Sequence, residues 1–173
     1  TIKQQGLEAD DLAAWICGKK EEFGIDNIWL ISSDRDWDLL IREGVSRFST
    51  VTRKEITIDN WDDHYDVQPD MYLTMKCLAG DTGDNIPGIA GIGPKRAVTL
   101  INDYGDLYDI YDTCPIDSKY KFIQSLNENV ERLLLNAELM DLESYSEQAL
   151  IEADMNLEDL SSQIIGYLNE NRD

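Results

Sequence analysis

The stretch from residue 80 to residue 97 reads GDTGDNIPGIAGIGPKRA, and it constrains the fold more than any other part of the chain. Two carboxylates, Asp81 and Asp84, lie among glycines, and a second glycine-rich turn precedes two adjacent cations, Lys95 and Arg96. Turn residues at this density predict tight turns between helices. Because acids repel a phosphate backbone and cations attract it, the stretch indicates a metal site followed within a few residues by a phosphate site.

Hydrophobic patterns predict an α/β front half and an all-helical back half. Residues 27–32 (NIWLIS) form a short apolar run that is typical of a buried strand in a parallel sheet. Residues 45–49 and 55–58 alternate in character around a polar TVTRK segment and predict a β-hairpin. Apolar residues at helical spacing indicate helices over residues 7–20, 69–79, 93–104, 107–112, 118–126, 128–141 and 157–169.

Composition restricts the classes of protein to which the chain can belong. Its 173 residues, of which 42% are hydrophobic, suit one domain or one domain with an appended helical lobe. No apolar run approaches the ~20 residues of a membrane span and no signal peptide is visible, so we expect no membrane partner and a cytoplasmic location. The net charge of −20 argues against a general nucleic-acid binder, which usually carries a basic patch. The three cysteines lie in apolar contexts and predict buried thiols.

Carboxylates gather at three points where predicted helices or strands begin or end. The first cluster precedes the helix over residues 7–20, the second follows the apolar strand, and the third lies where the helix over residues 69–79 ends. Since functional groups of open parallel sheets collect at the carboxyl ends of strands, we expect the clusters to converge in one cleft. The candidate ligands are Glu8, Asp10, Asp34, Asp36, Asp81 and Asp84.

Converging carboxylates repel one another unless cations lie between them. Because no histidine or cysteine accompanies these oxygens, they favour hard ions such as Mg²⁺ or Mn²⁺. Two such ions about 3.5–4 Å apart are the usual means of phosphodiester hydrolysis: one lowers the pKa of the attacking water and the other stabilises the leaving oxygen. Taken alone, each cluster also has a simpler interpretation. The first could be a favourable contact with the helix dipole, the second a solvated loop, and the third a turn or a calcium loop. Asp11 and Asp38 are interpreted as capping or surface groups.

The second glycine-rich turn is a candidate phosphate site. Gly91 and Gly93 permit close backbone approach, and a helix N-terminus directly after them places amides where a phosphate can bind. Lys95 and Arg96 add positive charge in the first helical turn. Such an element holds a DNA backbone without reading its sequence. The alternative is an ordinary turn between two helices.

The motifs EADD, SSDRDWD and GDTGDNIPGIAGIGPKRA together resemble the 5′-nuclease, or flap-endonuclease, family. The resemblance is strongest to the 5′-exonucleases of tailed bacteriophages and to the 5′-nuclease domain of bacterial DNA polymerase I. It runs from about Gly6 to at least Asp141, and the third motif is the most specific. It implies a magnesium-dependent 5′-3′ exonuclease and flap endonuclease that acts on branched or 5′-ended DNA in replication and repair, in a bacterial or phage-infected cell.

The resemblance also implies roles for the six candidate ligands. Three of them would hold one metal ion: Glu8, Asp10 and Asp34. The other three would hold or position a second ion: Asp36, Asp81 and Asp84.

The glycine-rich turn acquires a role from the same resemblance. Residues 88–96 would be the helix-hairpin-helix element that grips duplex DNA, and hairpin carbonyls in this family often hold a potassium ion. The implied DNA-binding residues are Gly88, Gly91, Ile92, Gly93, Lys95 and Arg96. Residues 1–80 would then be the C-terminal part of an α/β metal-site core with a mostly parallel sheet, and residues 81–173 the helix-hairpin-helix and helical lobe.

One departure from the family pattern affects activity. Family members begin with a strand that carries an aspartate, followed by a second acidic motif and a basic arch, whereas this chain begins about five residues before EADD. We therefore expect an N-terminally incomplete site that a missing segment or a partner chain completes, and little activity from this polypeptide alone. Two other functions stay open: a non-catalytic module that binds DNA structures, and an acidic interaction protein on the same scaffold.

Overall fold

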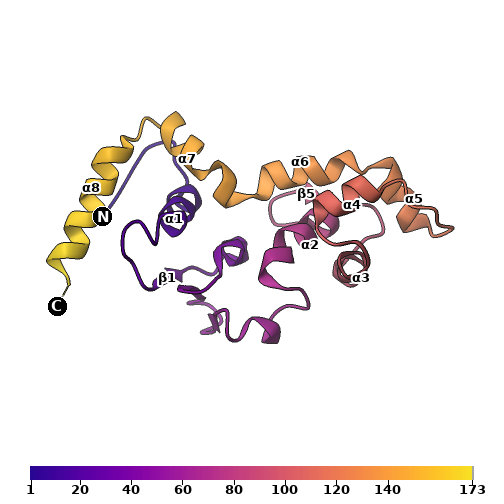
Figure 1. Cartoon of the computed structure of the whole chain (residues 1–173), viewed down its shortest axis with the longest axis horizontal. Helices are drawn as coiled ribbons and strands as arrows, with labels where there is room; N and C mark the ends of the chain where they lie inside the picture. Colours follow the sequence, from indigo (N-terminus) through magenta and orange to yellow (C-terminus); the bar gives the residue numbers. More distant parts are fainter. Residues whose placement is uncertain (173) are drawn as a thin grey trace. The chain divides into compact units, whose positions relative to one another are not determined.

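Contacts between residues organise the chain into two units in the computed structural model, which describes residues 1–172 (Figure 1). Unit 1 combines residues 1–58 with residues 142–172, and unit 2 comprises residues 59–141. The predicted boundary between residues 80 and 81 lies inside unit 2, and it stays a prediction about where the metal-site core ends. Over residues 1–172, none of the helices has the length and apolar character needed to cross a membrane.

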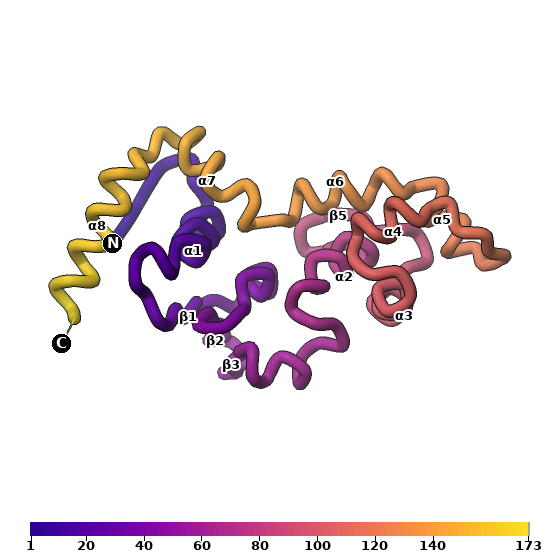
Figure 2. The backbone as a smooth tube through the Cα atoms, in the orientation of Figure 1, coloured from indigo at the N-terminus to yellow at the C-terminus, as the bar shows by residue number. Residues whose placement is uncertain are grey.

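Unit 1 is built on a small mixed sheet. Its strand order is β1-β2-β3, with β2 parallel to β1 and antiparallel to β3 (Figure 2). The elements of unit 1 are α1 (Ala9–Gly18), β1 (Ile28–Ile31), the 3-10 helix η1 (Arg35–Leu40), β2 (Val45–Phe48), β3 (Glu55–Ile56), α7 (Leu142–Glu152) and α8 (Leu157–Glu170). The first and last predicted helices, the parallel strand and the hairpin are confirmed, whereas α7 and η1 were not predicted.

The exposure of β1 corrects the prediction that this strand is buried on both faces. One face carries Leu30, which packs with Ala14 and Cys17 of α1 in a small apolar cluster. The other face carries Trp29 and Ile31, whose exposed fractions are 48% and 61%. Among the described residues β1 pairs only with β2, so it is an edge strand. An apolar run on both faces of a strand predicts that other elements cover both faces. The described residues cover only the face that carries Leu30.

Unit 2 is helical and contains the larger core. Fifteen buried residues form one continuous cluster, including Leu78 of α2 and Leu133 of α6. Gly80, with φ of +79°, ends α2 where the sequence predicted a stop. The elements of unit 2 are η2 (Trp61–Asp63), η3 (Pro69–Met71), α2 (Tyr72–Ala79), β4 (Gly80–Asp81), β5 (Ile86–Pro87), α3 (Pro94–Tyr104), α4 (Leu107–Thr113), α5 (Lys121–Glu128) and α6 (Glu131–Met140).

A buried amide joins three elements of unit 2. Asn136 of α6 is fully buried, and its Nδ2 donates to the carbonyl of Cys77 in α2 at 3.0 Å and to that of Pro87 in β5 at 2.9 Å. Since a buried backbone carbonyl requires a partner, these bonds connect the end of α2 to the loop that carries Asp81 and Asp84.

The cysteines largely match the predicted buried thiols. Cys17 of unit 1 and Cys77 of unit 2 are buried, and Cys114 is half-buried. Burial raises the pKa of the Cys17 thiol to about 11 and that of Cys77 to about 12, because the apolar surroundings disfavour the thiolate. Both buried thiols are therefore protonated at neutral pH.

Candidate functional site

Four of the candidate ligands lie together in unit 1, and we call Glu8, Asp10, Asp34 and Asp36 the unit-1 carboxylates. Glu8 is the N-cap of α1 and Asp10 lies in its first turn. Asp34 is the N-cap of η1, directly after β1, and Asp36 lies in the first turn of η1. The end of a strand and the start of two helical segments thus supply the group, as the placement of the motifs predicted.

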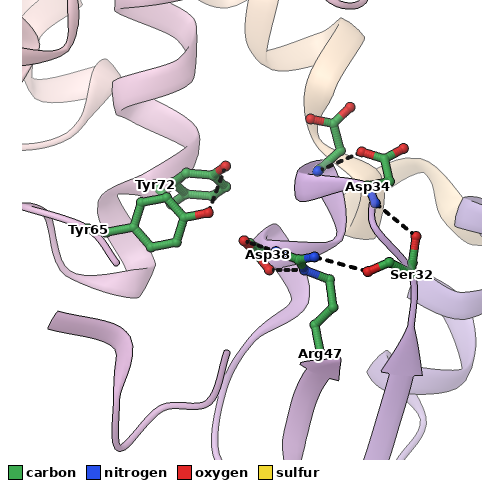
Figure 3. A network of polar contacts seen from close by, with 7 residues as sticks. Ser32, Asp34, Asp38, Arg47, Tyr65 and Tyr72 are labelled. Carbon is green, nitrogen blue, oxygen red and sulfur yellow. Dashed lines mark hydrogen bonds and ion pairs between the residues drawn. The ribbon is translucent and has the colours of Figure 1, made fainter. Parts of the chain in front are cut away.

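Local hydrogen bonds orient two of the unit-1 carboxylates. The Trp37 indole Nε1 donates to Asp10 Oδ1 at 2.6 Å. Asp34 Oδ1 accepts from the backbone N–H of Asp36 at 2.9 Å, and the backbone N–H of Asp34 donates to Ser32 Oγ at 3.1 Å (Figure 3). These are the bonds of a capped turn, so the SSDRDWD motif holds the Asp34 carboxylate in place.

The charges within this group act on one another. The pKa of Asp10 is raised, first by burial and then by the negative charges of Asp34, Glu8 and Asp36, against the lowering effect of the Trp37 hydrogen bond. A bound cation would remove this repulsion, because it favours the ionised form of every carboxylate around it. The donor set consists of oxygens alone, which suits hard divalent ions.

Asp38 and Asp11 differ from the other acids of these motifs. Asp38 is only 1% exposed, so its interpretation as a capping or surface group is wrong. Its Oδ2 accepts from Arg47 Nη2 at 2.9 Å, and Arg47 Nη1 donates to the carbonyl of Ser32 at 3.0 Å (Figure 3). This buried ion pair ties η1 to β1 and β2. Asp11, in the first turn of α1, is half-buried, and burial is the main cause of its raised pKa.

The remaining two candidate ligands lie in unit 2, and we call Asp81 and Asp84 the unit-2 carboxylates. Asp81 Oδ1 accepts from the backbone N–H groups of Gly83 at 2.9 Å and Asp84 at 3.2 Å. Its Oδ2 accepts from Lys76 Nζ at 2.7 Å. The hydrogen bond and the positive charge of Lys76 hold the pKa of Asp81 below its usual range. Lys76 therefore keeps Asp81 ionised, and the backbone N–H groups of the GDTGDN loop help to fix its carboxylate.

Lys76 was not identified from the sequence. It lies in the largely apolar helix YLTMKCLA and is only 8% exposed. The sequence did contain one signal for this contact. A single lysine in an apolar helix, five residues before Asp81, indicates a buried cation that needs an acidic partner. The structure thus brings four predicted ligands together in unit 1 and two in unit 2. The gathering of all six in one cleft stays a prediction.

The predicted hairpin, residues 88–96, leads directly into α3 in unit 2. A Cβ added to Gly88 would lie 2.5 Å from the backbone nitrogen of Gly80, so only glycine permits this close crossing of two backbone segments. Gly91 has φ of +81°, and Ile92 is buried below the turn. Gly93 is the N-cap of α3, and no side chain caps this helix end. The exposed turn therefore presents a helix N-terminus next to Lys95, as a phosphate site requires.

Lys95 and Arg96 are both exposed, but Arg96 has structural contacts that the sequence did not reveal. Arg96 Nη1 donates to the carbonyl of Gly91 at 2.6 Å. The Arg96 guanidinium carbon lies 4.4 Å from the centre of the Phe122 ring, which is a cation–π contact. Arg96 thus stabilises the turn itself, whereas no hydrogen bond or ion pair is described for the Lys95 side chain in residues 1–172.

Comparisons with known proteins identify the family to which this chain is related. Residues 67–164 match the family model described as 5′-3′ exonuclease, C-terminal SAM fold. The chain is 42% identical over 151 residues to a flap endonuclease of Escherichia phage T5, covering 87% of this chain and 52% of that protein. It is 31% identical over 141 residues to DNA polymerase I of Rhizobium leguminosarum, covering 82% of this chain and 14% of that protein. The chain therefore spans about half the length of its T5 relative.

Solved structures of the T5 enzyme match with a TM-score of 0.84. A T5 5′-exonuclease with bound zinc ions is 38% identical, covering 98% of this chain and 62% of its own. A T5 flap endonuclease complex with DNA and metal ions is 37% identical, covering 98% and 61%. The predicted fold class and family resemblance are confirmed: this chain belongs to the 5′-3′ exonuclease family and carries the C-terminal SAM fold of that family.

Proposed function

We propose that this chain contributes to a structure-specific 5′ nuclease, which hydrolyses phosphodiester bonds in branched or 5′-ended DNA by a two-metal mechanism. The observation that carries the proposal is the group of unit-1 carboxylates, gathered at the end of β1 and the start of α1 in a chain of the 5′-3′ exonuclease family. Mutual repulsion among four acids destabilises the protein, so their gathering requires another explanation. Ligation of cations supplies it.

The carboxylates of both units fit divalent ions by their chemistry. They offer oxygen atoms only, which favours Mg²⁺ or Mn²⁺, and T5 relatives were solved with metal ions. Such ions, when bound, lower the pKa of an attacking water and stabilise the leaving oxygen. The proposed ligands are Glu8, Asp10 and Asp34 for one ion, and Asp36, Asp81 and Asp84 for the second.

Side chains of this protein would prepare the ligands before an ion binds. The Trp37 indole holds one oxygen of Asp10, which leaves Oδ2 to face a cation. Lys76 and two backbone N–H groups hold Asp81 in one orientation and keep it ionised. Ligands that are fixed in advance lose less conformational entropy on binding.

The hairpin would hold the phosphate backbone of the duplex part of the substrate. The N-terminus of α3 carries the positive end of the helix dipole, and exposed Lys95 adds a full charge beside it. These contacts carry no sequence information, which suits an enzyme that recognises DNA structure. We also propose that carbonyls of the hairpin hold a potassium ion when DNA is bound.

Activity would require a further polypeptide segment of the family domain, in the same chain or in a partner. The T5 flap endonuclease is about twice as long as the matched region, since this chain spans 52% of it. In unit 1, β1 has a strand neighbour on one side only among the described residues, and Trp29 and Ile31 are exposed next to that edge. A further strand and a covering helix would bury these side chains.

A flap-cleavage assay tests the proposal. The purified chain is compared with the same chain supplemented, in cis or in trans, with the remaining segment of a family domain, in the presence of Mg²⁺. We expect little cleavage by the chain alone and structure-specific cleavage after completion. Asp34→Ala or Asp81→Ala should abolish that cleavage, whereas Asp112→Ala, which removes an exposed acid of α4, should leave it unchanged.

Each part of the proposal can fail separately. Robust cleavage by the isolated chain that Asp81→Ala abolishes would show that the further segment is dispensable. Cleavage that survives both Asp34→Ala and Asp81→Ala would refute the role of the carboxylates. Tight binding of flap DNA without cleavage in the completed protein would favour the non-catalytic module instead.

A further inference from the structure

The distribution of cations over unit 2 is uneven. Residues 59–141 contain 6 lysines and arginines against 16 aspartates and glutamates. Four of the six cations fall in two short segments, Lys95 and Arg96 in the hairpin and Lys119 and Lys121 at the start of α5. All four of these side chains are exposed. In a strongly acidic unit, cations that gather in so few places indicate a surface for an anionic partner.

Contacts through Phe122 place the second segment against the first. The Phe122 ring lies 4.4 Å from the guanidinium carbon of Arg96. A Cβ built on Gly91 would lie 3.3 Å from the Phe122 Cβ, so the first turn of α5 packs against the hairpin itself. Lys121 directly precedes Phe122 in the chain. The two basic segments are therefore adjacent, although 22 residues lie between Arg96 and Lys119 in the sequence.

Tyr120 adds an exposed aromatic ring to this surface. It is the N-cap residue of α5, its side chain is 59% exposed, and its ring stacks on Phe122 at 5.8 Å between ring centres with an angle of 24°. The unit has a well-formed apolar core that does not include Tyr120. An exposed tyrosine between two lysines suits a sugar–phosphate backbone, because its hydroxyl donates to phosphate oxygens and its ring contacts the sugar.

We propose that Lys119, Tyr120 and Lys121 form a second phosphate-contact segment, which extends the grip of the hairpin along the same DNA duplex. The inference rests on the proposed DNA binding by the hairpin and adds to it a segment outside residues 88–96. Phe122 and Arg96 act as positioning residues, since they hold the segment and the turn together. The competing explanation is that these lysines only offset the negative charge of the unit.

Salt dependence of duplex binding separates the two explanations. The affinity of the full chain for a short blunt duplex is measured at several salt concentrations for the wild type, for Lys119→Gln/Lys121→Gln, and for the control Lys3→Gln/Lys54→Gln. The control removes the same charge from exposed positions in unit 1. We expect the slope of log affinity against log salt to fall by roughly 1.8 for the first variant and to stay unchanged for the control, because each lost phosphate contact changes it by about 0.9.

A neutral variant provides a second readout. Tyr120→Ser should weaken duplex binding by roughly 10- to 100-fold, the range of one hydrogen bond to a charged group, while the salt slope stays that of the wild type. Equal salt slopes for the wild type and Lys119→Gln/Lys121→Gln would overturn the inference. Equal reductions of the slope in that variant and in the control would overturn it as well.

Failure of the inference is distinguishable from failure of the proposed function. If Lys95→Gln lowers the salt slope and Lys119→Gln/Lys121→Gln does not, the hairpin binds DNA and the second segment does not. If the wild type has no affinity for the duplex at low salt, both the hairpin site and its extension are refuted.

Discussion

Units 1 and 2 both carry candidate carboxylate ligands, but the two units differ in their apolar cores. Unit 2 has one continuous core of fifteen buried residues, and its carboxylate loop is tied down by Lys76 and Asn136. Unit 1 distributes its buried apolar residues over smaller clusters and leaves Trp29 and Ile31 exposed on its sheet. Unit 2 therefore has the larger continuous core, and we expect unit 1 to open more readily than unit 2.

The largest expected effect concerns the buried ion pair of unit 1. Arg47→Ala removes the guanidinium that pairs with the buried Asp38 carboxylate, and we expect a loss of ~3–5 kcal/mol in the free energy of unfolding. Urea-dependent hydrogen exchange of unit 1 amides measures it. Glu143→Ala, which breaks the exposed pair with Arg42 in the same unit, should cost at most about 1 kcal/mol. Similar losses in both variants would contradict the structural role of Arg47.

An intermediate effect is expected in unit 2, where Asn136 joins α2, α6 and β5. Asn136→Ala leaves two carbonyls without this donor and should destabilise unit 2 by ~1–3 kcal/mol. Exchange of amides in residues 80–87 should accelerate as well, since the carboxylate loop loses an anchor. Asn102→Ala, at an exposed position of α3, is the matched control and should change neither quantity. An unchanged loop in Asn136→Ala would show that Lys76 alone holds it.

Thiol labelling compares the two units within one molecule. Cys17 and Cys77 are buried and protonated at pH 8, so an alkylating reagent reaches them only when their unit opens. We expect Cys17 to react at least ~10-fold faster than Cys77, which corresponds to a difference of about 1.4 kcal/mol in opening free energy. Mass spectrometry of the labelled peptides measures both rates. Faster labelling of Cys77 would contradict the expectation that unit 1 opens more readily than unit 2.

The smallest effect is expected at the exposed face of β1. Ile31→Thr should change the unfolding free energy of the isolated chain by less than about 0.5 kcal/mol, because the side chain is 61% exposed and threonine keeps the β-branched shape that suits a strand. If a further segment completes the protein as proposed, the same substitution should weaken the association with that segment. A large destabilisation of the isolated chain, measured by urea unfolding, would show that the strand is covered already and that unit 1 needs no partner.

Much of the fold could be predicted because its signals are local. Gly80 and Gly105 end α2 and α3 where the sequence indicated stops, and the apolar spacing identified α1 within a few residues. Helix α7 was missed because its pattern of apolar residues is weak, although it packs against α1 in unit 1. Its stability comes from that contact and not from local preference.

The candidate site also combines features that the sequence determines locally with contacts that only the tertiary structure shows. The sequence by itself determined which carboxylates stand at the ends of elements, because residue type and element boundaries are written locally in motifs such as SSDRDWD. Only the tertiary structure decided that Asp38 pairs with Arg47, that Lys76 holds Asp81, and that Phe122 supports Arg96. It also decided that Trp29 is exposed although its neighbours are apolar. These properties depend on which surfaces meet, and the pairing of distant segments is set by packing of the whole unit.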